Sequence, residues 1–266
     1  MFVYTTVYCI SRGILADPMT KTSPRADTAY QALRRAIIEH ALTPGTKLPE
    51  DEIGSHFGMS RTLVRATLAR LQSEGLVGTK PRRSATVAKP TLKEAKEVFA
   101  MRLALEREAV RLVGENWKPE FGAILDGNIR EEEAAAAAGD ASVSIRLAGE
   151  FHITLASLTD NTLLRRFLGE LVSRCSLILA VYRRPHSSDC AINEHREIVD
   201  ALRRRDAARA IALMEAHVRS VAHRALIFEN AAAELELSAI LSKYAGAVVA
   251  RGAAVDIRSA KPKARK

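Results

Sequence analysis

Three histidines in the second half of the chain have the spacing of a ligand or metal site. His195 and His217 stand eleven residues before and eleven residues after Asp206, which follows an expected turn between two helices. In an antiparallel helical hairpin, residues placed in this way lie at the same level on facing helices. His152 belongs to an earlier helix, and bundles commonly assemble core sites from several helices. Three imidazoles can hold Zn, Ni, Cu or Fe with positions left open for water or ligand oxygens, or they can share an anion.

A second group of residues, between 48 and 65, has the chemistry of a DNA-reading helix-turn-helix. Gly58 is expected to end one short helix, and Ser60 is expected to cap the next. Arg61 and Arg65 lie one turn apart at the start of that second helix, and guanidinium groups bind phosphate or guanine edges bidentately. An ordinary helical hairpin with a solvated basic face is the alternative interpretation. The residues expected to enter a major groove are Ser60, Arg61, Thr62 and Arg65.

The segments around this pattern favour the DNA-binding interpretation. Residues 42–50 (LTPGTKLPE), 60–65 (SRTLVR) and 71–77 (LQSEGLV) keep an order and spacing that resembles the winged-helix domain of GntR-type bacterial transcription regulators. The resemblance covers residues 26–89. Short strands expected at 76–79 and 85–88 would form the β wing, with Ser84 where the family usually has glycine. The basic tip of the wing would bring Arg82 and Arg83 to the phosphate backbone or the minor groove.

The composition is that of a two-domain globular protein with a basic first domain. The chain has 266 residues, of which 47% are hydrophobic, so disorder of the whole chain is excluded. Residues 20–90 hold 12 Lys and Arg against 6 Asp and Glu, whereas residues 91–250 hold 21 against 23. This charge balance predicts a nucleic-acid-binding head fused to a body that binds neither DNA nor an anionic membrane.

Both ends of the chain are expected to lie outside the folded domains. Residues 1–25 are predicted to be a disordered or misassigned leader, because the apolar start lacks a basic flank and is too short to span a bilayer. Residues 246–266, in which the last 16 hold 6 Lys and Arg against 1 Asp, are predicted to be a basic disordered tail. Three scattered cysteines exclude a disulfide framework and favour a reducing cytoplasm.

Between these ends the chain is predicted to be mainly α. One helix is expected at 27–41 before the helix-turn-helix, so that residues 26–89 form a winged helix-turn-helix with a small β wing. Residues 90–245 are rich in Ala, Leu, Arg and Glu and predict an all-α bundle that binds an effector and dimerises. The bundle helices are expected at 91–117, 120–138, 140–158, 161–182, 189–204 and 206–230, with a shorter one at 233–244.

The bundle segments carry a second resemblance. Residues 98–106 (VFAMRLALE), 150–152 (EFH), 155–161 (LASLTDN), 190–195 (CAINEH) and 214–218 (MEAHV) resemble the FCD ligand-binding domain of FadR-like GntR regulators, over residues 93–244. The resemblance implies that His152, His195 and His217 line an effector site and hold a divalent metal, Zn or Ni.

The resemblance also places Arg102 in the cavity, where it would bind a carboxylate; the alternative is an i,i+4 salt bridge to Glu106. Many relatives supply an acidic ligand at the position of Ala148. The metal is therefore either completed by water or effector, or replaced by a metal-free anion pocket.

Together these observations predict a cytoplasmic, nucleoid-associated bacterial transcription regulator that binds an inverted-repeat operator as a homodimer. It would sense a small carboxylate, and repression relieved by the effector is the expected sign, with activation as the alternative. No membrane partner and no enzymatic activity are expected. The rival hypothesis is a metal-dependent hydrolase or lyase with an accessory DNA-binding head. It is disfavoured because the sequence has neither a His-Glu-x-x-His helix nor a glycine elbow that bears a nucleophile.

Overall fold

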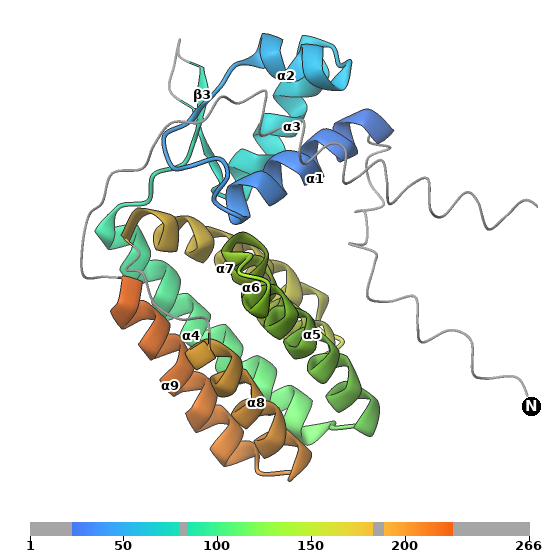
Figure 1. Ribbon diagram of the computed structural model, residues 1–266, viewed down its shortest axis with the longest axis vertical. Coiled ribbons are helices and arrows are strands. Elements are labelled where there is room, and N and C mark those ends of the chain that lie inside the picture. The colour runs from blue at the N-terminus through green and yellow to red at the C-terminus, as the bar shows by residue number, and fades with distance from the viewer. Residues whose placement is uncertain (1–22, 80–83, 183–188, 226–266) are drawn as a thin grey trace, which may run out of the picture.

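The computed structural model describes residues 23–79, 84–182 and 189–225. The described chain forms a small head of three helices and a three-stranded sheet, which sits against one end of a bundle of longer helices (Figure 1). The mainly α fold predicted from the sequence is confirmed. The leader, Arg82 and Arg83 at the wing tip, the short helix expected at 233–244 and the basic tail lie outside the described residues.

The head begins with helix α1 (Pro24–Ile38), three residues before the predicted start. The prediction was wrong because Pro24, which has no N–H to lose, fits the first helical position. The helix also ends before residue 41, since His40 adopts a left-handed φ of 59°. Helices α2 (Glu50–Phe57) and α3 (Arg61–Ser73) follow, and Gly58 between them adopts φ 61°. Ser60 caps α3 by accepting a hydrogen bond from the backbone N–H of Leu63 at 3.4 Å, as predicted.

The wing contains one more strand than predicted. Strands β2 (Val77–Gly78) and β3 (Ala85–Val87) pair antiparallel, and β3 also pairs with β1 (Lys47–Leu48), giving the order β1-β3-β2. A strand of two residues carries too short an alternation to be recognised in a sequence. Pairing with both neighbours ties the wing to the segment that enters α2.

The bundle is built around helix α4, which packs against α6, α7 and α9. Thr91 and Glu94 form a capping box at its start, in which each side chain binds the other residue's backbone N–H. Helices α8 and α9 form an antiparallel hairpin closed by Arg205, whose φ is 60°. The six bundle helices of the described chain are α4 (Leu92–Glu115), α5 (Pro119–Ala137), α6 (Ala141–Ser157), α7 (Thr162–Tyr182), α8 (Asp189–Arg203) and α9 (Ala207–Ala225). Among the described helices, none is both long enough and apolar enough to cross a membrane.

Candidate metal centre and nucleic-acid interface

The structure brings the three predicted histidines together inside the bundle. His152 comes from α6, His195 from α8 and His217 from α9, and all three are at least 97% buried. One potential ligand atom from each lies within 4.8 Å of the other two. The rings of His195 and His217 are 4.8 Å apart, so the two residues lie at the same level of the hairpin as their spacing predicted. Phe151 stacks on the His195 ring at 4.0 Å and fixes its plane.

Each histidine is oriented by a glutamate on its Nδ1 atom. Nδ1 of His152 lies 2.5 Å from Oε2 of Glu106 on α4. Nδ1 of His195 lies 3.1 Å from Glu132, and Nδ1 of His217 lies 2.6 Å from Glu194. None of these three pairs was predicted from the sequence, where Glu106 was considered only as a partner of Arg102. A carboxylate behind a histidine is the usual support of a metal ligand, because it fixes the tautomer and raises the basicity of the other nitrogen.

Contacts with ionised carboxylates favour one tautomer of each ring, although Nδ1 of His152 and Oε2 of Glu106 form a close ion pair without hydrogen-bond geometry. Ionised carboxylates only accept hydrogen bonds, so Nδ1 is the protonated nitrogen and Nε2 carries the lone pair. Nε2 of His152 and Nε2 of His217 face each other at 3.3 Å. Nε2 of His195 is buried and has no hydrogen-bond partner within the described part of the chain. In this tautomer three lone pairs meet in a buried space, where a cation would stabilise them; a proton on one Nε2 would instead make the contact between His152 and His217 a hydrogen bond.

The electrostatics of the centre keep the His152 and His217 rings neutral and the Glu106 carboxylate charged. Burial lowers the pKa of His152 to about 4 and that of His217 to about 3. Burial alone would raise the pKa of Glu106, but attraction to Arg102 and His152 outweighs it and the pKa is lowered. Neutral imidazoles are the form that binds metals.

The donor set fits a divalent metal ion. Two imidazole nitrogens bound to zinc at about 2.0–2.1 Å in tetrahedral geometry lie about 3.3–3.4 Å apart, which matches the 3.3 Å between His152 and His217. Around the centre, the described chain places two fully buried acidic side chains, Glu106 and Glu132, and one buried guanidinium, that of Arg102, so the surroundings favour a cation. Three nitrogen ligands leave positions open for water or ligand oxygens. Ala148 offers no donor, so this chain supplies no fourth ligand at that position.

Arg102 lies beside the centre and takes part in its ion pairs. Its Nε donates to Glu106 Oε1 at 2.7 Å, which is the i,i+4 pair considered in the sequence, and its Nη1 donates to Cys175 Sγ at 3.0 Å. Its Nη2 is buried without a hydrogen-bond partner among the described residues. One donor of the guanidinium thus stays free, and the carboxylate-binding role of Arg102 remains a prediction.

The predicted DNA-reading residues lie together on an exposed edge of α3. The side chains of Arg61 and Arg65 are 72% and 68% exposed, and Ser60 and Thr62 beside them are also exposed. Arg61 Nε donates to Asp51 at 2.9 Å, and Arg65 Nε donates to both oxygens of Glu50 at 3.1 and 2.9 Å. Exposed ion pairs contribute about 0–1 kcal/mol, so DNA can displace the two carboxylates at low cost.

Comparison with known proteins identifies both domains. The model of the bacterial regulatory proteins of the gntR family matches residues 25–87, and the FCD domain model matches residues 97–220. The chain belongs to the GntR family. Within the part that the two models cover, the GntR match corresponds to the head and the FCD match to the bundle.

Relatives of this GntR regulator share most of its length. The HTH-type transcriptional regulator YdhC of Bacillus subtilis is 27% identical over 192 residues, which cover 71% of this chain and 85% of YdhC. The HTH-type transcriptional repressor RspR of Escherichia coli is 23% identical, over 76% of this chain and 90% of RspR. A GntR structure from Rhodococcus sp. RHA1 has the same fold, with a TM-score of 0.68, 22% identity and coverage of 77% and 98%. The family and these relatives are regulators, not enzymes.

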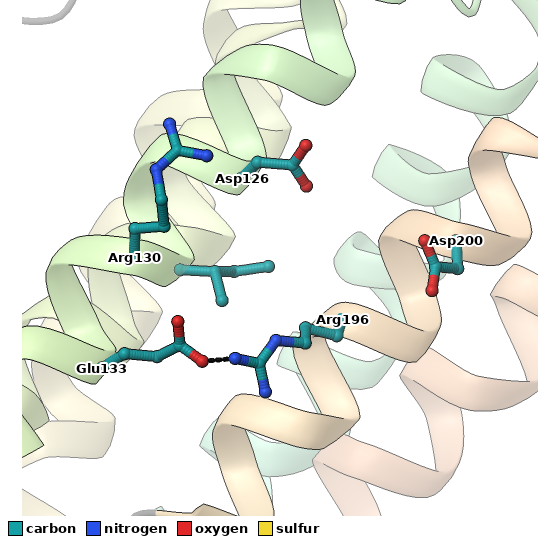
Figure 2. Close-up of a pocket in the computed structure, with 6 residues that line it drawn as sticks. Asp126, Arg130, Glu133, Arg196 and Asp200 are labelled. Carbon is teal, nitrogen blue, oxygen red and sulfur yellow. Dashed lines mark ion pairs between the residues drawn. The ribbon is translucent and has the colours of Figure 1, made fainter.

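A polar surface cavity lies between α5 and α8 of this FCD domain. It has a volume of about 220 Å³, and Figure 2 shows an ion pair between Glu133 and Arg196 across it. Glu133 and Arg196 directly follow Glu132 and His195, so the surface ion pair neighbours the buried one. The cavity is lined by Asp126, Ile129, Arg130, Glu133, Arg196 and Asp200, and thus by none of the three histidines.

Acidification is expected to destabilise the metal-free regulator well above the pH at which most carboxylates titrate. The folded pKa values of His152 and His217 lie below the ordinary value of 6.5, so the unfolded chain binds more protons at intermediate pH. The free energy of unfolding therefore falls as the pH drops below about 6.5. By pH 4.5 the loss is on the order of 5 kcal/mol for the two residues together.

Urea titrations in chelator at pH 7, 6, 5 and 4.5 measure this effect. The double substitution His152→Asn with His217→Asn should flatten the pH dependence between pH 6 and 5. The matched control is His223→Asn, since His223 is an exposed histidine on the same helix as His217. Equal slopes for the wild type and the double variant would show that the two imidazoles are not held neutral.

Proposed function

We propose that this GntR regulator is a homodimeric repressor that works in the cytoplasm on an inverted-repeat operator and senses a small carboxylate at a metal centre of His152, His195 and His217. The observation that carries the proposal is the gathering of three buried imidazoles in the core of an FCD domain, each with a glutamate at its Nδ1 atom. A bound Zn or Ni ion would supply Lewis acidity and a site for carboxylate oxygens. The family and its relatives argue against the rival, a metal-dependent hydrolase or lyase.

Different residues of the chain would bind the metal ion and the carboxylate of the effector. The three imidazoles would hold the ion, and the glutamates behind them would hold the imidazoles in place. Arg102 is joined to this set through Glu106, and its Nη2, which has no hydrogen-bond partner among the described residues, would bind the effector's carboxylate. The bundle would thus recognise an anion by combining a metal ion with a guanidinium.

The homodimer is proposed because two winged helices are needed to read two inverted half-sites. Apolar side chains that a second copy could cover are present on the bundle. Met101 on α4 is 52% exposed, and Leu163 and Phe167 on α7 are 58% and 45% exposed. Large apolar side chains exposed to this degree in a monomer are typical of interaction surfaces when they form a patch. The test of the dimer is the mass of the purified protein in solution.

A thermal-shift screen tests the sensing proposal. Purified protein of known metal content is heated with each member of a library of small carboxylates, before and after chelation. A carboxylate at 100 times its Kd contributes about 2.7 kcal/mol, which corresponds to a rise in Tm of roughly 5–10 °C for a chain of this size.

Each outcome of the screen has a defined meaning. A shift that chelation removes supports the metal centre. A shift that survives chelation supports Arg102 and a metal-free anion pocket, and rejects the metal as co-ligand. If none of the carboxylates shifts the Tm, carboxylate sensing is rejected, while the DNA-binding role of the head is unaffected.

A further inference from the structure

Helix α7 contacts the head with a short run of residues, 173–177. Arg34 of α1 donates from Nη2 to Ser173 Oγ at 2.7 Å, and Ser176 Oγ donates to the carbonyl oxygen of Ile38 at 2.8 Å. Leu177 is fully buried within the apolar core of the head. A bundle helix therefore provides part of the head's own core, and the two domains are packed as one unit at this point (Figure 1).

The same run contacts the end of the DNA-reading helix. Arg174 Nε donates to the carbonyl oxygen of Glu74, the C-cap residue of α3, at 3.0 Å. Arg34, which holds Ser173, also pairs with the Glu74 carboxylate at 3.2 Å. Gly75 permits this approach, because it adopts φ 74° and a Cβ there would lie 2.4 Å from Arg174 Nε. A shift of residues 173–177 would therefore move the C-terminal end of α3 through two contacts.

Other residues at this part of α7 pack into the core of the bundle. Cys175 and Ile178 lie in the core cluster of the bundle, and both are at least 98% buried. Cys175 Sγ accepts a hydrogen bond from Arg102 Nη1 at 3.0 Å. Cys175 thus stands between two head-contacting residues of α7 and faces the guanidinium that neighbours the histidine centre.

A continuous polar chain joins Cys175 to that centre. The polar chain consists of Cys175, Arg102, Glu106 and His152. Arg102 Nε donates to Glu106 Oε1 at 2.7 Å, and Glu106 Oε2 lies 2.5 Å from His152 Nδ1. Every member of the polar chain is at least 97% buried. In such surroundings, charge interactions are not screened by water, and a change at one member affects the next strongly.

Within the polar chain, Glu106 is the residue that would respond to a cation bound at the histidine centre. Its two oxygens are shared between His152 and Arg102, so a stronger hold by one weakens the hold by the other. A cation on Nε2 of His152 makes the Nδ1–H a stronger donor and draws Glu106 toward the imidazole. Arg102 then changes its contact with Cys175, and packed helices respond to such changes by discrete shifts.

We propose that residues 173–177 of α7, through the polar chain, are the element that transmits occupancy of the histidine centre to the DNA-reading helix. This inference rests on the proposed function, because it takes the histidine centre as the sensing site. It assigns a positioning role to Arg102 and Cys175. Neither residue would bind the ion, so a measurement of zinc affinity alone would not show this role.

Hydrogen exchange of the full-length chain tests the inference, with Zn²⁺ alone as the probe and chelated protein as the reference. In the wild type, zinc should slow amide exchange around His195 and His217 and also in the head, at residues 33–40 and 70–76. We expect the head amides to change by about fivefold or more, the lower end of ordinary coupling between sites. The matched pair of variants is Cys175→Ala, which cannot accept the Arg102 hydrogen bond, and Cys175→Ser, which can.

Cys175→Ala should keep the zinc effect at the histidine helices and lose it in the head, whereas Cys175→Ser should retain both. Ser176→Ala, on the head side of α7, is the second variant and should also lose the head effect. Head protection that persists in both Cys175→Ala and Ser176→Ala would overturn the inference, as would wild-type protection confined to the histidine helices. Absence of any zinc effect in the wild type would reject the metal centre of the proposed function together with its transmission.

Discussion

Replacing His195 and His217 together with alanine is expected to abolish zinc binding by the regulator. The substitution leaves His152 as the single imidazole that the described part of the chain places at the centre, and one nitrogen ligand does not hold zinc against water. Loss of an outer partner alone typically costs 10- to 100-fold in metal affinity, so removal of two ligands should cost at least about 100-fold. Isothermal titration of chelated protein with zinc measures the affinity directly.

The controls separate a lost ligand from a disturbed fold. His223→Ala removes an exposed histidine from the same helix and should leave zinc affinity unchanged. Glu132→Gln keeps an oxygen that accepts from His195 Nδ1 but removes the charge, and it should weaken zinc binding about 10- to 100-fold. Zinc affinity of the double variant within a factor of two of the wild type, with the fold intact by circular dichroism, would refute the metal centre.

The position of His195 and His217 could be predicted from the sequence, because in a helical hairpin the number of residues between each histidine and the turn sets its level along the helices. Residues equidistant from a tight turn face each other, and the turn at Arg205 lies where the sequence places it. The chemistry of single side chains then suffices to propose a site. The reading helix was predictable for a similar reason, because Gly58 and Ser60 are strong local signals for a helix end and a helix start.

The glutamates behind the histidines could not be predicted in the same way. Glu132 stands between two other glutamates, a pattern that is typical of a solvated helix face, yet it is fully buried. Its burial depends on how α5 is rotated against α8, which the packing of Leu125 and Ile129 decides. Glu194 carried a weak signal, since it directly precedes His195.

The docking of α7 on the head was also beyond sequence analysis. Ser173, Arg174 and Ser176 belong to no motif of helix α7, and their partners in the head are about 100 or more residues away in the chain. Contacts between distant segments depend on the arrangement of whole elements. Periodicity predicts each element but does not fix that arrangement.

Arg65→Ala is expected to remove specific operator binding while the oligomeric state stays the same. In the free protein Arg65 is exposed, and among the described side chains its ion pair is with Glu50; such a pair adds about 0–1 kcal/mol of stability. On DNA the freed guanidinium would bind a guanine edge or a phosphate. A bidentate base contact contributes about 1–3 kcal/mol per subunit, so loss of both copies in a dimer should weaken operator binding by roughly 30-fold to more than 1,000-fold.

The control for Arg65 lies on the same helix. Arg70 pairs with Asp27 and stacks on the Tyr30 ring at 3.4 Å, so its guanidinium faces α1 instead of the exposed reading edge. Arg70→Ala removes the same charge and should change specific affinity by only a few fold. Both variants are compared by fluorescence anisotropy, on DNA selected in vitro with the wild type and on a scrambled duplex at the same salt concentration. If Arg65→Ala keeps the wild-type preference for the selected DNA, then α3 does not read the operator through this residue.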